Sequence, residues 1–167
     1  MQFGWINICG AVIVAVMMIP NIIYAVRRKD QKNPCANRFL NLLEQVGRYG
    51  CVILMWLPLL VWKFGFASVA GMLVYLAGNA LLLGAYLIVF ALYLRTQTPR
   101  RAMILAVLPA CIFLLSGLTL RHWLLAAFAV LFAVGHICVT NKNANIPAPG
   151  EPRSSETPRD TGEDTIK

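Results

Sequence analysis

The chain alternates long apolar runs with short clusters of charged residues. Five such runs predict five membrane-spanning helices, because about 20 apolar residues in helical form cross the hydrocarbon core of a bilayer. The predicted spans cover about 3–26, 46–66, 67–94, 102–120 and 123–140. We therefore expect an all-α fold, namely a polytopic membrane protein whose five-transmembrane-helix bundle occupies residues 1–141.

The segment before the second span has a helical pattern of a different kind. Residues 37–48 place apolar side chains on one face and the pair Glu44 and Arg48, at i and i+4, on another. This pattern predicts a short interfacial helix. The apolar run Tyr49–Trp62 covers only about 21 Å as a helix, which is less than the core of about 30 Å. The second span must therefore extend beyond this run at both ends, to about 46–66.

The third run contains no charged residue from Phe66 to Leu94. Four polar side chains in it fall within about 40° of one another on a helix, at 100° per residue. These residues are Tyr75, Asn79, Tyr86 and Tyr93. A strip of small residues beside them (Gly71, Gly78 and Ala85) favours close packing against other helices. We expect this span to be the central helix of the bundle.

Residues 142–167, which follow the last apolar run, form a tail whose composition differs from that of the spans. Pro, Ser, Thr, Glu and Asp dominate it, and it contains too few apolar residues to form a core. Such a composition is typical of disorder. We expect residues 142–167 to be a disordered cytosolic tail.

The basic residues predict the orientation in the membrane. Six Lys and Arg lie in 27–48 and three in 95–101, against one each at Lys63 and Arg121. The positive-inside rule then places the N-terminus outside and the C-terminus in the cytosol. Three of the tryptophans, Trp5, Trp62 and Trp123, fall at the predicted outer interface, where aromatic residues are common. The net charge of +8 therefore reflects topology, and no nucleic-acid partner is expected.

Motifs of membrane enzymes and of metal sites are missing from the sequence. No acidic residue lies in the middle of a span, and no HExxH, GxSxG or P-loop pattern occurs. The five cysteines form no CxxC pair, and the two histidines are about 21 Å apart on a helix. We expect no metal and no cofactor, and the balance is against an enzyme.

One candidate site follows from the topology, because polar side chains from several spans fall at a similar depth near the cytosolic ends. They are Asn21, Glu44, Gln45, Arg48, Tyr93 and His136. They could bind an anionic headgroup or a small polar solute, or move a proton. The structural alternative is that Glu44 and Arg48 only pair with each other. Tyr75, Asn79 and Tyr86 are likewise either packing contacts or the lining of a pathway, and packing is favoured.

The leading hypothesis for function is a small multi-pass protein that acts through membrane partners or lipids. One alternative is a small oligomeric transporter or channel with the polar strip facing the pathway. Another is a membrane enzyme that acts on lipid headgroups at the cytosolic face. The expected partners are the lipid bilayer, anionic headgroups, and a second copy or another membrane protein. The size and loop lengths suit a bacterial inner membrane.

Overall fold

A computed structural model describes residues 7–27, 38–57, 59, 66 and 68–144. These residues form five helices and, within the described ranges, no strand. The helices are α1 (Ile8–Arg27), α2 (Arg38–Trp56), α3 (Val69–Arg95), α4 (Pro99–Thr119) and α5 (Trp123–Ala144). The expected all-α fold is confirmed.

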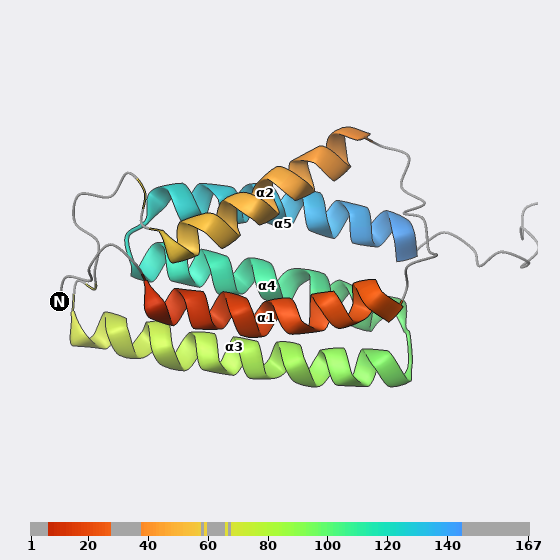
Figure 1. Ribbon diagram of the computed structural model, residues 1–167, viewed down its shortest axis with the longest axis horizontal. Helices are drawn as coiled ribbons and strands as arrows, with labels where there is room; N and C mark the ends of the chain where they lie inside the picture. Colours follow the sequence, from red (N-terminus) through yellow and green to blue (C-terminus); the bar gives the residue numbers. More distant parts are fainter. Residues whose placement is uncertain (1–6, 28–37, 58, 60–65, 67, 145–167) are drawn as a thin grey trace, which may run out of the picture.

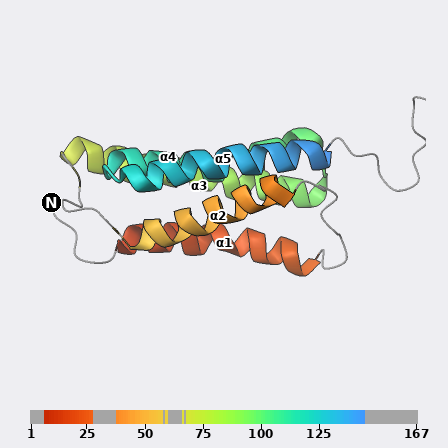
Figure 2. The same ribbon diagram turned by 90° about the horizontal axis from the view of Figure 1, so that it is seen from above.

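The helices form two layers. In Figure 1, α3, α4 and α5 lie side by side in that order, and Figure 2 shows α1 and α2 together on one face of this layer. The direction of the chain reverses from each helix to the next. The end of α1, the start of α2, the end of α3, the start of α4 and the end of α5 therefore share one end of the bundle.

Three of the helices, α3, α4 and α5, are long and apolar enough to cross a membrane. The apolar part of α1, Ile8–Tyr24, is shorter. The helix α2 runs without a break from Arg38 to Trp56, so residues expected in the interfacial helix and in the second span belong to one helix. Residues 58 and 60–65 of the expected second span, and the tail from residue 145 on, lie outside the described residues.

The expectation that the third span is central is wrong. The helix α3 lies at one edge of its layer and packs against α4 and α1 (Figure 1). The close backbone contacts occur elsewhere. A Cβ added to Gly117 would lie 2.8 Å from the backbone nitrogen of Ala126, which brings α4 and α5 together. In α3, a Cβ at Gly78 would meet only the flexible end of the Leu115 side chain, and Gly71 faces no other helix within 4 Å.

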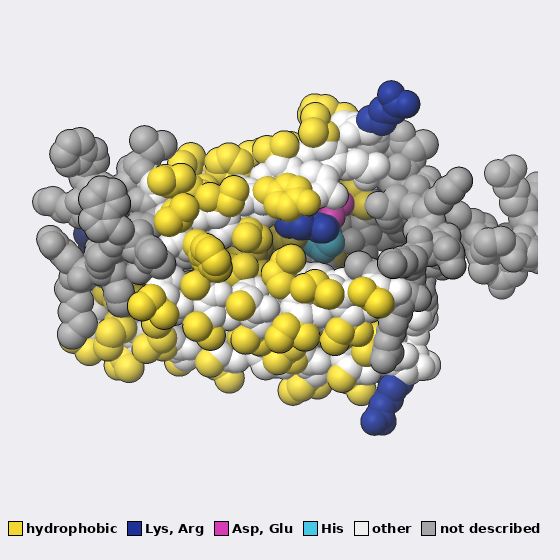
Figure 3. Space-filling view, in the orientation of Figure 1, with side chains coloured by type: hydrophobic (Ala, Val, Ile, Leu, Met, Phe, Trp, Pro, Cys, Tyr) yellow, Lys and Arg dark blue, Asp and Glu magenta, His cyan; other side chains and the backbone are white. Residues whose placement is uncertain are grey.

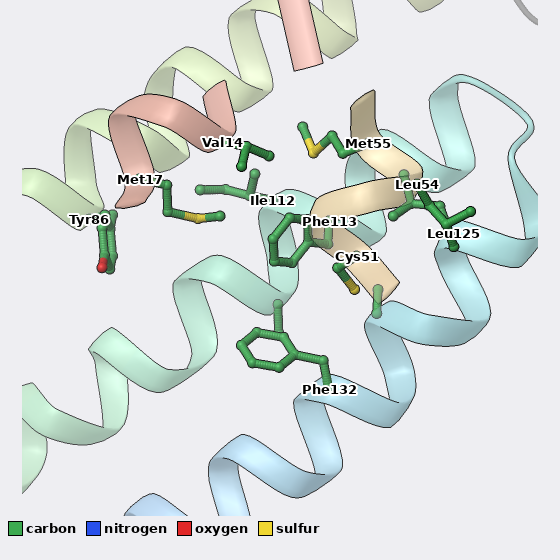
Figure 4. Packing of buried hydrophobic residues seen from close by; sticks show 12 residues of the cluster. Val14, Met17, Cys51, Leu54, Met55, Tyr86, Ile112, Phe113, Leu125 and Phe132 are labelled. Carbon is green, nitrogen blue, oxygen red and sulfur yellow. The ribbon is translucent and has the colours of Figure 1, made fainter. Parts of the chain in front are cut away.

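The main core lies between α2, α4 and α5, with α1 closing it on one side. Phe113 of α4 meets Phe132 of α5 edge to face, with ring centroids 5.8 Å apart. Cys51 of α2 is fully buried and lies near both rings (Figure 4). Val14 and Met17 of α1 extend the same cluster. The core thus holds α2 firmly over α5.

The turn between α4 and α5 is tightly hydrogen-bonded. Arg121 adopts a left-handed conformation with φ of 55°, and the His122 amide donates to the Gly117 carbonyl at 2.8 Å. This is a Schellman ending of α4. The Nδ1 atom of His122 accepts from the Leu125 amide at 3.0 Å and so caps α5.

Candidate functional site

Glu44 is the centre of a polar cluster between α2 and α5. Its Oε1 atom lies 2.9 Å from Nδ1 of His136 and pairs with the guanidinium of Arg48 one turn along α2. The Glu44 side chain is 9% exposed, whereas that of His136 is 22% and that of Arg48 is 37% exposed. Glu44 is also the one acidic residue in the described part of the chain. The structure thus brings together three residues of the candidate site.

Two glycines allow this contact, because they let the backbones of α2 and α5 touch. A Cβ added to Gly47 would lie 2.6 Å from the backbone nitrogen of Phe132. A Cβ added to Gly135 would lie 2.7 Å from the backbone nitrogen of Glu44. Any larger residue at either position would push the helices apart. The short distance between Glu44 and His136 therefore depends on small residues on both helices.

The imidazole of His136 is held in a defined orientation. Its ring stacks on Phe132, with centroids 4.9 Å apart and planes at 16°. An ionised carboxylate can only accept hydrogen bonds, so Nδ1 of His136 donates to Glu44. The Nε2 atom is then the one that can take up a further proton.

The cluster reaches the surface. Figure 3 shows a dark blue, a magenta and a cyan side chain gathered between α2 and α1 on a face that is otherwise mostly apolar. Their mutual contacts identify them as Arg48, Glu44 and His136. We call these three residues the polar patch. About 9 Å of helix axis separates His136 from Lys142, near the end of α5.

Two further polar residues extend the patch toward α1 and α3. The hydroxyl of Tyr86 donates to the side-chain oxygen of Asn21 at 3.4 Å. Tyr86 is buried, and it lies close enough to Arg48 for an electrostatic interaction. Asn21 itself is exposed, and its amide donates to the Met17 carbonyl at 3.3 Å. Polar groups from four helices therefore gather around Arg48.

The other two residues of the candidate site are Tyr93 on α3 and Gln45 on α2. The ring of Tyr93 packs at 6.2 Å from that of Tyr24, at the same end of α1 and α3. Gln45 is exposed and is turned about 100° from Glu44 around α2.

Two residues of the polar strip on α3 belong to a separate, buried network. Asn79 accepts from the Ser116 hydroxyl at 3.2 Å and donates to the Tyr75 carbonyl at 2.8 Å. The side-chain amide of Asn7 lies 3.5 Å from the Tyr75 hydroxyl. Tyr75, Asn79 and Ser116 are each at most 1% exposed. The polar strip of α3 therefore contributes to two networks: the buried network around Asn79, and the one in which Tyr86 contacts Asn21.

Sequence reasoning missed three residues that shape these networks: Asn7, Ser116 and Gly135. Ser116 and Gly135 are small residues within apolar runs, and no spacing distinguishes them. The residues that the structure describes contain no group of three His, Cys, Asp or Glu side chains able to hold a metal ion. No protein-family model, curated protein or solved structure matches the chain.

Proposed function

We propose that the chain is a five-span integral membrane protein of a bacterial inner membrane. Three long apolar helices and the apolar part of α1 support four crossings. The fifth crossing would be the second span along the chain, over residues 46–66, and residues 37–48 would lie at the interface. The described Lys and Arg residues at one end of the bundle are Arg27, Arg38, Arg95, Arg100, Arg101 and Lys142, against Arg121 at the other. By the positive-inside rule, the first end is cytosolic, with the N-terminus outside.

We further propose that this protein acts through lipids, and that the polar patch binds an anionic lipid headgroup. The observation that carries the proposal is the partly exposed Arg48 on an apolar face, about midway along α2 and close to the start of the proposed second span, 46–66. A cation next to lipid is costly unless a counter-charge lies close to it. Glu44 supplies one, and a lipid phosphate can approach the exposed side of the guanidinium.

The surroundings of the patch favour a lipid over a free anion. Apolar side chains on the helices beside it are exposed, among them Ile22 on α1 and Val46 and Tyr49 on α2. Acyl chains can lie against such side chains, while the headgroup reaches Arg48 and Asn21. A small soluble anion would gain the charge contact alone.

Native mass spectrometry of the purified protein tests this proposal. Phosphatidylglycerol should stay bound to the wild type and be lost from Arg48→Ala. The matched control is Arg95→Ala, because Arg95 is an exposed arginine at the same end of the bundle. Equal retention by all three proteins would contradict the proposal. Equal affinity for a water-soluble phosphodiester would contradict the assignment to a lipid.

A second candidate, an enzyme acting on lipid headgroups, is favoured by the pairing of His136 with Glu44 beside Arg48. A carboxylate that orients an imidazole is a common arrangement for a general base. The same spectra distinguish the two functions, because turnover would change the mass of the bound lipid. They also test the proposal of a partner, since a second copy or another membrane protein would appear as added mass. The transporter alternative gains little from the strip, since Asn79 and Tyr75 are buried.

A further inference from the structure

The net charge of the polar patch disfavours the binding of an anion unless a proton binds together with it. Arg48 carries one positive charge and Glu44 one negative charge, and both meet at Oε1 of Glu44. With a neutral His136, the patch is therefore uncharged. A bound monoanion would make it negative on an apolar face, and unbalanced charge is costly there. A protonated His136 restores neutrality.

We propose that the polar patch binds the anionic headgroup together with one proton, and that His136 holds this proton. The inference rests on the proposed function and specifies how that site is regulated. The geometry supports it in two ways. Nδ1 of His136 faces Glu44, which stabilises an imidazolium, and Nε2 remains for the added proton. Arg48, which would hold the headgroup, shares the same carboxylate oxygen.

The neighbouring helices supply the other charges around His136. Glu44 and Arg48 are the charged residues of α2 that contact it directly or through one carboxylate. On α4, which packs along the other side of α5, the charged residues are Arg100 and Arg101 in the first turn. Arg101 donates to carbonyls at the end of α3. Glu44 is the one acidic residue in the described part of the chain, so it is the counter-charge available to a protonated His136.

Two residues farther from His136 complete the set of titratable and charged groups around it. Tyr86 of α3 interacts electrostatically with Arg48 and stays neutral in the range tested. On α5 itself the charged residue in the described range is the exposed Lys142, about 9 Å along the axis. Neither supplies a negative charge that could replace the proton. Binding of a monoanion should therefore be linked to protonation of His136.

This linkage has a definite sign. When binding takes up one proton, affinity rises as the pH falls, by up to about tenfold per pH unit. The suitable interval is about pH 5.5 to 8, where histidine side chains change charge. Phosphatidylglycerol is a suitable probe because its phosphodiester keeps one negative charge throughout. Any change in affinity then comes from the protein.

The experiment measures the affinity of the full chain in detergent for a short-chain phosphatidylglycerol across this interval. The wild type should bind at least tenfold more weakly at the high-pH end. His136→Gln should bind weakly at every pH, because glutamine can donate to Glu44 but takes up no proton. Glu44→Gln should bind well at every pH, because the patch then carries a positive charge without a proton.

The outcomes separate this inference from the proposed function. Binding that depends on Arg48 but is equally strong at all pH values in the wild type would overturn the linkage alone. No binding at any pH would overturn both. Proton uptake on adding lipid to the weakly buffered wild type needs no variant, so the test survives if a variant fails to fold. About one proton per bound lipid supports the linkage, and none contradicts it.

Discussion

Gly135→Ala should separate α2 from α5 at the polar patch. The added Cβ would lie 2.7 Å from the backbone nitrogen of Glu44 and 2.9 Å from its Cα. Both are backbone atoms of a helix, so no side-chain rotation can relieve the overlap. Raising the 2.7 Å contact to the 3.4 Å of ordinary van der Waals contact requires a local shift of about 0.7 Å.

Two opposing effects set the size of the change in stability. Overpacking costs about 1–3 kcal/mol, whereas replacing a helical glycine by alanine returns about 0.5–1 kcal/mol. We therefore expect a net loss of about 1 kcal/mol in the free energy of unfolding. The same shift would stretch the 2.9 Å contact between Glu44 and His136 to about 3.6 Å, beyond hydrogen-bonding range.

The assay is thermal unfolding of the purified protein in detergent, followed by tryptophan fluorescence. A loss of about 1 kcal/mol lowers the midpoint by about 2–4 °C in a chain of this size. The matched control is Gly84→Ala, because a Cβ at Gly84 meets no atom within 4 Å. The control should unfold at the wild-type temperature or above. Equal midpoints for both variants, with equal retention of phosphatidylglycerol, would refute the close contact between α2 and α5.

Two further predictions concern buried polar residues. Burial lowers the pKa of the His122 imidazole, so the unfolded chain binds a proton more readily and stability should fall as the pH drops below about 6.5. His122→Asn keeps an acceptor for the Leu125 amide and should weaken this dependence; an unchanged dependence would argue against a neutral, buried imidazole. Asn79→Cys should resist a water-soluble maleimide, because the Asn79 side chain is 1% exposed, while Gln97→Cys, at an exposed position, should react. Fast labelling at residue 79 would instead indicate a wet pathway.

Periodicity and charge were sufficient to predict three of the helices closely, but not α2, which is one helix where two segments were expected. The apolar runs gave α3, α4 and α5 to within a few residues, and the spacing of Glu44 and Arg48 predicted a pair on one side of α2. For His136 and Glu44, the sequence predicted only that the two side chains lie at a similar depth in the membrane. It did not predict that they touch. Whether two side chains at equal depth touch depends on which helices are neighbours, and this depends here on Gly47 and Gly135.

The place of the third span was beyond prediction for the same reason. The spacing of Tyr75, Asn79, Tyr86 and Tyr93 shows that these residues share one face of the helix, but the groups opposite that face decide what it does. Ser116 and Asn7 make one end of the strip part of a buried network, whereas Tyr86 donates to Asn21 and lies near Arg48. Gly71 and Gly78, which the sequence favoured for close packing of α3, make no close backbone contact of the kind seen between α4 and α5.

The most direct test of the central claim is to locate the bound lipid on the chain. A phosphatidylglycerol with a photoreactive group near its headgroup would be crosslinked to the protein in a bilayer, and the labelled peptides identified by mass spectrometry. We predict labelling around Asn21 on α1 and Arg48 on α2, with both signals lost in Arg48→Ala. Labelling spread along the exposed apolar face of α3, around Leu81, and unchanged in Arg48→Ala would contradict the claim.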